Sequence, residues 1–260
     1  MSLRGAISED TAKVSATTTD WLLNGQVRLQ QPAVGYRVAI DPILLAAAVP
    51  AVAGEVAFDL GSGTGAATLC LHHRVHGCQI VGLESDTDML VLAQHNASLN
   101  DAENRVTFVR GDAASPPTQI TAQTFDHVFS NPPYLEPIRA DGRNEGSRQR
   151  VVANLEQTMG LTAWIKVMAT AAKPKGRLTL IHRADRLDEL LAALRCYAGG
   201  IVVYPLWPKL GHSAKRVLVS ARTGVATPLR MAPGLVLHEA LGAYTEAARN
   251  VLENGAPLVI

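Results

Sequence analysis

The sequence has little cysteine, and no pattern that would put cysteine to use. Its 260 residues include Cys70, Cys78 and Cys196 and no other cysteine. The three form no CxxC pair, and an odd number does not close a disulfide framework. The sequence therefore favours neither a disulfide scaffold nor a cysteine zinc site, and we expect three buried thiols.

Long hydrophobic runs are also missing. The longest, from Pro42 to Gly54, is too short to cross a bilayer as a helix, and residues 1–20 lack the apolar core of a secretory signal. We therefore expect a cytoplasmic protein that does not contact a membrane. GxSxG and P-loop motifs are absent as well, so hydrolases and nucleotide triphosphatases lack their usual signatures.

Overall charge is nearly balanced, at +1, but it is unevenly distributed along the chain. Residues 1–130 contain 7 Lys/Arg against 13 Asp/Glu, whereas residues 131–260 contain 17 against 10. Such an asymmetry indicates a polyanionic partner on the side of the second half, provided that other features agree with it.

What the sequence does contain is an alternation of short apolar runs with longer amphipathic ones. Unbroken apolar runs are typical of buried parallel strands. The strands are predicted at 55–60, 78–84, 105–112, 125–130, 176–182, 200–206 and 214–221, and the helices between them at 66–76, 86–99, 152–172 and 186–197. This order predicts an α/β protein with a Rossmann-like, doubly wound, mostly parallel seven-stranded sheet. No helix separates the last two strands, so we expect an antiparallel hairpin at one edge.

A glycine-rich loop follows the first predicted strand, in the stretch DLGSGTGAA. Gly61, Gly63 and Gly65 permit a tight turn and a close approach of the backbone to a ligand, and a helix begins directly after them. The loop therefore predicts a cofactor site. Because the stretch also satisfies GxGxxA, and Glu84 ends the second strand, a nicotinamide-dependent oxidoreductase stays open at this point.

The fourth predicted strand ends in Asn131-Pro132-Pro133-Tyr134. A proline pair does not continue a ladder and fixes φ, so the chain must leave the sheet in a stiff, extended form. The side-chain carbonyl of Asn131 and the backbone carbonyl of Pro132 could each accept one hydrogen of a planar amine. Tyr134 offers a ring face for stacking a base. We predict these four residues as the catalytic group.

Taken with Asp59 before the first glycine and Asp112 at the end of the third strand, these motifs resemble the class I S-adenosylmethionine-dependent methyltransferases over about residues 55–222. The resemblance implies that the loop contacts the methionine part of the cofactor, that Glu84 binds the ribose hydroxyls and that Asp112 meets the adenine amine. It implies the cofactor-binding set Asp59, Gly61, Gly63, Gly65, Glu84, Asp112 and Asn131.

The flanking segments narrow the resemblance. Residues 21–49 contain a hairpin pattern, the pair Tyr36-Arg37 and then Asp41 with Pro42, which suit the N-cap and first turn of a helix. This stretch and the tail after residue 204 resemble the bacterial tRNA adenine-N6 methyltransferase family. The resemblance implies methyl transfer to adenine N6 in structured RNA, most readily tRNA. It also suggests three parts: an N-terminal segment at 1–54, the methyltransferase domain at 55–222 and a C-terminal extension at 223–260.

Asn-Pro-Pro-Tyr identifies an acceptor atom but not a molecule, because methyltransferases of guanine N2 in ribosomal RNA and of glutamine N5 in proteins share it. A noncatalytic RNA-binding protein of the same fold is a further alternative, and the oligomeric state is open. The segment at 136–150 matches no family pattern. Candidate RNA contacts are Arg143, Arg148, Lys209, Lys215 and Arg216.

The histidine-rich stretch HHRVH, with His72, His73 and His76, lacks the glutamate of a zinc-protease HExxH motif. It falls near the end of a predicted helix, where histidine is electrostatically favoured. We therefore predict no metal site.

Overall fold

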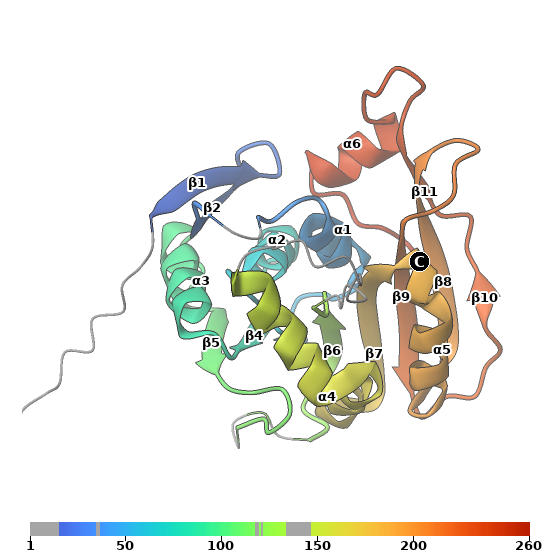
Figure 1. Ribbon diagram of the computed structural model, residues 1–260, viewed down its shortest axis with the longest axis horizontal. Coiled ribbons are helices and arrows are strands. Elements are labelled where there is room, and N and C mark those ends of the chain that lie inside the picture. The colour runs from blue at the N-terminus through green and yellow to red at the C-terminus, as the bar shows by residue number, and fades with distance from the viewer. Residues whose placement is uncertain (1–15, 35–36, 118–119, 121, 134–146) are drawn as a thin grey trace, which may run out of the picture.

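In the part of the chain that the structure describes, a sheet of nine strands forms the centre of the molecule, with helices on both of its faces (Figure 1). The computed structural model describes residues 16–34, 37–117, 120, 122–133 and 147–260, and only the backbone within 147–158. The strand order is β10-β8-β9-β7-β6-β3-β4-β5, and β11 pairs with β8 beside β10. The predicted strands are β3 (Val56–Leu60), β4 (Gln79–Glu84), β5 (Val106–Arg110), β6 (Phe125–Ser130), β7 (Ala172–Arg183), β8 (Ala198–Lys209) and β9 (Arg216–Thr223).

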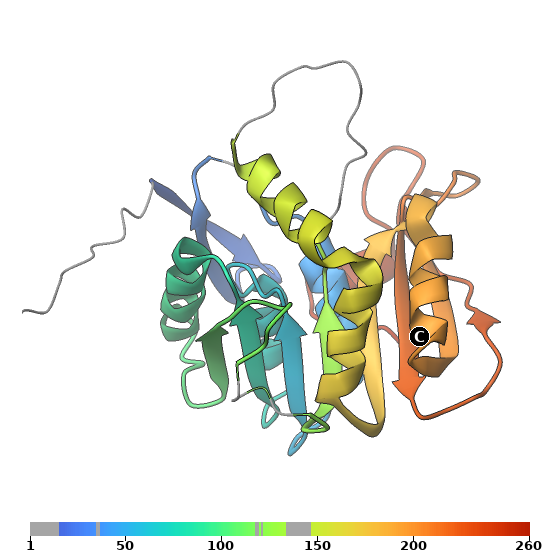
Figure 2. The same ribbon diagram turned by 60° about the horizontal axis from the view of Figure 1, so that its bottom comes forward.

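The central strands pair in parallel, and the helices that connect them cover both faces of the sheet. In β3, residues 57–60 are all buried, and the strand pairs in parallel with β4 on one side and β6 on the other. In Figure 2 the arrowheads of these strands point in one direction. The strand order reverses at β3, so a crevice is expected beyond the carboxyl ends of β3 and β6.

Two apolar clusters hold helices to the two faces. One combines α1 (Asp41–Ala48), α2 (Ala66–Arg74), α3 (Thr87–Leu99) and α6 (Glu246–Leu252), and the other combines α4 (Ser147–Ala171) with α5 (Leu187–Arg195), which follows a short 3-10 turn, η1 (Ala184–Arg186). Asp86 is the N-cap of α3 and its side chain accepts hydrogen bonds from the Asp88 and Met89 N–H groups. Helix α4 kinks at Gly160, whose φ is 64° and ψ is 157°.

The predicted doubly wound fold is confirmed, with two additions in the C-terminal region. Strands β8 and β9 form the expected antiparallel pair. The far edge of β8 is covered by two short parallel strands, β10 (Arg230–Met231) and β11 (Leu235–His238). The hairpin therefore lies one step inside the edge of the sheet, because the exposed side of a twelve-residue strand is paired rather than left open.

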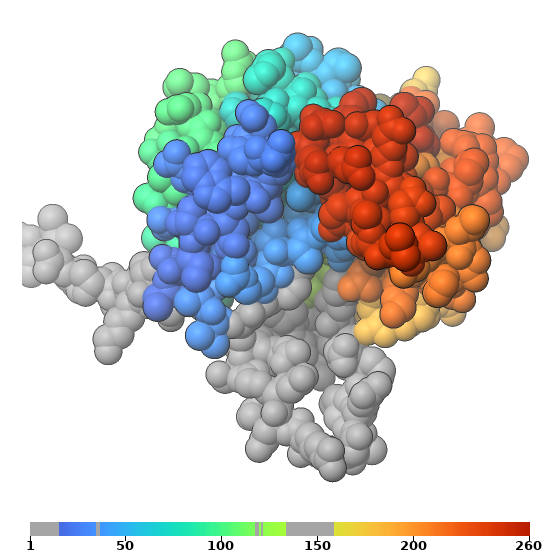
Figure 3. Space-filling model, turned by 90° about the horizontal axis from the view of Figure 1, so that it is seen from above, coloured from blue at the N-terminus to red at the C-terminus, as the bar shows by residue number. Residues whose placement is uncertain are grey.

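The N-terminal region forms a separate two-stranded hairpin, β1 (Thr17–Leu22) and β2 (Val27–Pro32), followed by α1. Figure 3 shows this hairpin and the C-terminal segment on one face of the molecule, on either side of α1. Residues of both segments join the apolar cluster that contains α1 and α2. The division into parts at 1–54, 55–222 and 223–260 stays a prediction.

Two local expectations were wrong. Asp41 is the first residue of α1 rather than its cap: Ile40 takes the N-cap position, no side chain caps the helix, and the Asp41 carboxylate pairs with Arg216 instead. Cys196 is exposed, whereas Cys70 and Cys78 are buried as expected, and all three thiols are free. Within the described residues, no helix has both the length and the apolar character needed to cross a membrane.

Candidate active site

The loop after β3 is held in a compact turn by backbone hydrogen bonds to the neighbouring strand β4. The N–H groups of Gly61 and Ser62 both donate to the Leu83 carbonyl of β4 at 3.0 Å. Gly61 and Gly65 have positive φ, of 75° and 85°. A Cβ at Gly65 would stand 2.6 Å from the Phe108 ring, and a Cβ at Gly61 would stand 3.0 Å from Trp164. Glycine is therefore required at both positions by conformation and by space.

Glu84 ties the loop to the end of β4. One carboxylate oxygen accepts the Gly63 N–H at 2.8 Å, and the other accepts the N–H groups of Ser85 at 2.8 Å and Asp86 at 2.9 Å. Burial raises the pKa of Glu84, although these hydrogen bonds act to lower it. Each carboxylate oxygen has two lone-pair directions, so the oxygen that accepts from Gly63 retains capacity for a ligand hydroxyl.

Asp59 lies beneath the loop and is only 2% exposed. Its carboxylate accepts a hydrogen bond from the Thr68 hydroxyl of α2 at 2.7 Å. Burial raises the pKa of Asp59 to about 7; the Thr68 hydrogen bond opposes this shift and the nearby charge of Glu84 adds to it. Its position indicates that Asp59 supports the loop from below by linking β3 to α2.

Two hydroxyl groups of the loop provide a test of the expected cofactor. Ser62 Oγ and Thr64 Oγ1 are buried, and neither has a hydrogen-bond partner among the described residues. A buried hydroxyl without a partner is costly, so such groups are usually matched by a ligand or water. Beside the Glu84 carboxylate, they give the loop the polar groups that the amino acid and ribose parts of S-adenosylmethionine require.

Asp112 lies at the carboxyl ends of the parallel strands, as the cofactor loop and Glu84 do. Strand β5 pairs in parallel with β4, with Arg110 opposite Glu84, so Asp112 follows just beyond the carboxyl end of β5. Its side chain is exposed and accepts the Ala114 N–H at 2.8 Å. The predicted cofactor residues on β3, β4 and β5 are therefore brought to one edge.

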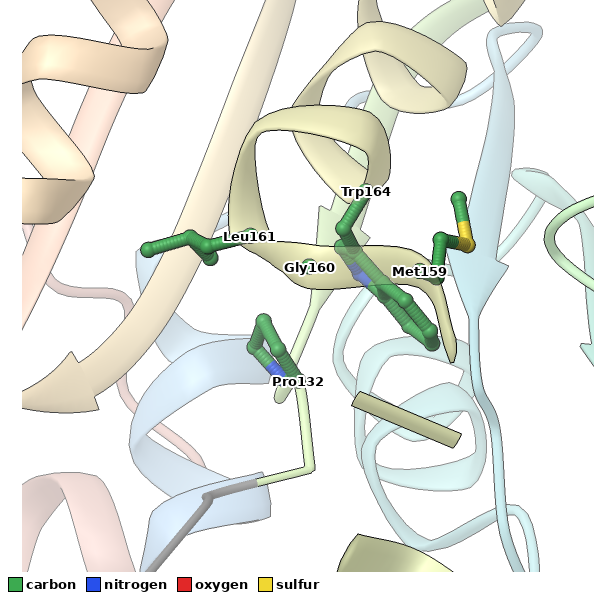
Figure 4. A pocket seen from close by; sticks show the side chains of 5 residues that line it. All are labelled: Pro132, Met159, Gly160, Leu161 and Trp164. Carbon is green, nitrogen blue, oxygen red and sulfur yellow. The ribbon is translucent and has the colours of Figure 1, made fainter. Parts of the chain in front are cut away.

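The end of β6 is joined to the cofactor loop by one hydroxyl. Ser130 Oγ donates to the Leu60 carbonyl at 2.7 Å and accepts from the Trp164 indole N–H at 3.0 Å. Asn131 and Pro132 follow Ser130 directly, so they leave the sheet beside the residue that precedes Gly61. Figure 4 shows Pro132 and the Trp164 ring on the same side of the α4 turn at Gly160.

A shallow hollow adjoins this strand end, lined by Pro132, Met159, Gly160, Leu161 and Trp164. Trp164 is 8% exposed and packs in the core, and its hydrogen bond to Ser130 was not predicted from the sequence. The sequence carried one signal for it, a serine immediately before Asn131. Nothing in the sequence indicated that an indole 34 residues away would reach that serine.

The remaining predicted residues have different outcomes. Tyr134 and Arg143 lie outside the described residues, and for Arg148 only the helical backbone of α4 is described. Lys209 donates to the Ala240 carbonyl at 3.0 Å, Lys215 is exposed, and Arg216 pairs with Asp41 at 3.0 Å. The last three residues lie where β8 ends and β9 begins, at the same edge as the loop. No cluster of metal-binding side chains occurs within the described part of the chain.

Comparisons with known proteins agree with this geometry. A family model described as a methyltransferase domain matches residues 51–200. A tRNA1(Val) (adenine(37)-N6)-methyltransferase of Haemophilus influenzae is 31% identical over 226 residues, covering 85% of this chain and 92% of that protein. One of the same name from Porphyromonas gingivalis is 29% identical over 239 residues, covering 87% and 91%.

Among solved structures, a predicted O-methyltransferase from Agrobacterium tumefaciens superposes with a TM-score of 0.70 at 25% identity, covering 84% of this chain and 98% of that one. The cofactor is therefore S-adenosylmethionine, and not the nicotinamide nucleotide that the glycine pattern alone left open. The chain is an enzyme of the class I S-adenosylmethionine-dependent methyltransferases and belongs to the bacterial tRNA adenine-N6 methyltransferase family.

Proposed function

We propose that this chain transfers a methyl group from S-adenosylmethionine to N6 of an adenine in tRNA. The observation that carries the proposal is the end of β6, where the Ser130 hydroxyl donates to the Leu60 carbonyl at 2.7 Å. This bond keeps Asn131 and Pro132 next to the cofactor loop. An acceptor bound by these two residues would therefore lie beside the methyl donor.

An exocyclic adenine amine is a weak nucleophile because its lone pair is delocalised into the ring. Two acceptors that hold both of its N–H bonds orient the nitrogen, and the Asn131 side-chain carbonyl and the Pro132 carbonyl are our candidates. Pro133 contributes no N–H that would compete for them. Catalysis is then mainly alignment and electrostatics.

S-adenosylmethionine supplies an electrophilic methyl group on a sulfonium centre. As the new N–C bond forms, the S–C bond breaks and its electron pair stays on sulfur. The amine nitrogen then loses one proton to water. On the cofactor side, we assign the methionine part to the loop from Asp59 to Gly65, the ribose hydroxyls to Glu84 and the cofactor adenine to Asp112. We assign stacking of the target base to Tyr134.

The choice of acceptor rests on the relatives and on the motif. The curated relatives are named for adenine 37 of tRNA1(Val), whereas the Agrobacterium tumefaciens structure is described as a predicted O-methyltransferase. A hydroxyl has a single hydrogen and needs a base to remove it. A pair of neutral acceptors suits an amine instead. A tRNA substrate also implies a cytoplasmic enzyme, which we include in the proposal.

The test is methyl transfer from tritiated S-adenosylmethionine to purified tRNA, ribosomal RNA, DNA and protein, followed by digestion of the labelled RNA to nucleosides. We expect label in N6-methyladenosine from tRNA, with tRNA1(Val) as the first species to assay. A transcript with guanosine at position 37 is the matched control.

Label in N2-methylguanosine from ribosomal RNA, or in protein glutamine, would move the acceptor to the alternatives that share the motif. Absence of transfer to any fraction, with normal binding of S-adenosylmethionine, would favour a noncatalytic RNA-binding protein. An unreduced signal from the guanosine-37 transcript would place the methylated adenine elsewhere in the tRNA.

A further inference from the structure

Among the described residues, the edge of β2 that faces away from β1 is paired by side chains instead of by another strand. The N–H and carbonyl of Arg28 bond to Asn100 Oδ1 and Nδ2 at 2.9 and 2.7 Å. The N–H and carbonyl of Gln30 bond to Asn96 Oδ1 and Nδ2 at 2.7 and 2.9 Å. One amide of α3 and the amide of its C-cap residue, Asn100, therefore take the place of a third strand.

The match is geometric. Residues two apart in a strand are separated by ~6.6 Å, and residues four apart in a helix by ~6 Å along the axis. Asparagines at i and i+4 thus fall in register with alternate backbone groups of a strand edge. An edge satisfied in this way is also closed to pairing with another chain.

Asn96 makes one further contact that Asn100 does not. Its second amide hydrogen goes to the Thr64 carbonyl in the cofactor loop at 2.9 Å, and Asn96 is 0% exposed. The second amide hydrogen of Asn100 is instead donated to the backbone carbonyl of Asn96, at 2.7 Å. With one acceptor bond and two donor bonds, the Asn96 amide joins the hairpin, α3 and the loop in one network.

The contact from Asn96 restrains Thr64 at the centre of the cofactor loop. It stands between Gly63, whose N–H is bound by Glu84, and Gly65, which has left-handed φ. The direction of the Thr64 carbonyl fixes the turn, and the buried Thr64 hydroxyl has no partner among the described residues.

We propose that Asn96 is a positioning residue for the cofactor: by holding the Thr64 carbonyl, it fixes the turn of the loop that binds S-adenosylmethionine. The same amide holds Gln30, so docking of the hairpin and binding of the cofactor are coupled. By linkage, the cofactor must then stabilise the docked hairpin as much as the docked hairpin favours the cofactor.

The experiment compares Asn96→Ala with Asn100→Ala, a matched control that removes two hairpin contacts but none to the loop. Calorimetry gives the Kd for S-adenosylmethionine, and hydrogen exchange follows the backbone of residues 17–32 with and without it. We expect Asn96→Ala to raise Kd about five- to tenfold, the scale of one or two lost hydrogen bonds, and Asn100→Ala to leave it within about twofold.

In the parent protein, saturating cofactor should slow hairpin exchange, and Asn96→Ala should abolish that response. Equal losses of affinity in the two asparagine variants would mean that both simply weaken α3, and would overturn the proposal. The proposal would also be overturned if hydrogen exchange in the hairpin of the parent protein were the same with and without the cofactor. This measurement needs no variant. Should Asn96→Ala fail to fold, Asn96→Ser gives the same comparison. None of these outcomes depends on which acceptor the enzyme methylates.

Discussion

Asp59 shows how a single buried carboxyl can make stability depend on pH. Burial raises its pKa to about 7, so the folded protein favours the protonated form more strongly than the unfolded chain does. The stability that this group contributes is fully present below the unfolded pKa of about 3.8, and it is lost as pH rises through about 7. Asp59 therefore opposes folding most at alkaline pH.

We predict that Asp59→Asn, which keeps the shape and can still accept from Thr68, is stabilised relative to the parent as pH rises. At ~1.4 kcal/mol per pKa unit, the difference in unfolding free energy should shift by ~2 kcal/mol between pH 5.5 and 8. Urea unfolding at the two pH values, without cofactor, measures this. A pH-independent difference would mean that Asp59 stays ionised in the folded state.

Asn131 is in the predicted catalytic group and in the cofactor-binding set that the resemblance implies, and we predict that its main action is on the acceptor amine. Asn131→Ala should lower the single-turnover rate on the order of a hundredfold, about 2.7 kcal/mol, and leave the Kd for S-adenosylmethionine within about twofold. Rapid-quench assays on tRNA and calorimetry give the two quantities. A near-parental rate would reduce the motif to a structural turn.

At the scale of elements, the Ser130 hydroxyl connects β6, β3 and α4. It bonds to the Leu60 carbonyl and to the Trp164 indole N–H, and the Trp164 ring packs against Gly61. The strand that ends in the predicted acceptor motif and the strand that ends in the cofactor loop thus share one polar contact. Their relative position is set by a helix that comes much later in the chain.

Ser130→Ala should leave the Leu60 carbonyl and the Trp164 N–H without this partner, and should cost ~1–3 kcal/mol of unfolding free energy. Trp164→Phe keeps one aromatic ring but removes the donor and the rest of the buried indole, so its cost should combine the lost hydrogen bond, about 1 kcal/mol, with the cavity that is left. If the contact aligns the two strand ends, kcat should fall more than KM for the cofactor rises. Lower stability with an unchanged kcat would show that the contact serves folding alone.

For the whole molecule, the charge asymmetry of the sequence has a spatial counterpart at the ends of β8 and β9. Lys209 and Lys215 lie there, at the edge of the sheet that carries the cofactor loop. Arg216 is less suited to RNA contact, because its guanidinium pairs with Asp41, whose side chain is 13% exposed. Replacing Arg216 would leave the Asp41 carboxylate without this charged partner and could destabilise the fold. The RNA-binding test therefore leaves Arg216 unchanged.

Neutralising Lys209 and Lys215 together as glutamines should weaken tRNA binding and flatten its log–log salt dependence by about one to two units, at ~0.7–0.9 per phosphate contact. Cofactor binding should not change. The control is Lys166→Gln with Lys175→Gln, which alters two exposed lysines of α4 and the opposite end of β7. Equal slopes in both double variants would remove this surface from the tRNA-binding face.

By itself, the sequence determined the parts of this protein that depend on local pattern. Unbroken apolar runs predicted the parallel strands, glycine spacing predicted the turn after β3, and the proline pair predicted the stiff exit from β6. These features are set by sterics within a few residues, so the backbone has few alternatives. The family resemblance then supplied the cofactor and the reaction.

Only the tertiary structure decided which side chains complete the site. Trp164 reaches Ser130 across 34 residues, Asn96 reaches Gln30 across 66, and Arg216 reaches Asp41 across 175. Such partners are chosen by how helices pack on a twisted sheet, which no short window of sequence records. For the same reason the prediction of Asp41 as a helix cap was wrong. The distant Arg216 is a charged partner for its carboxylate, in place of the backbone N–H groups of its own helix.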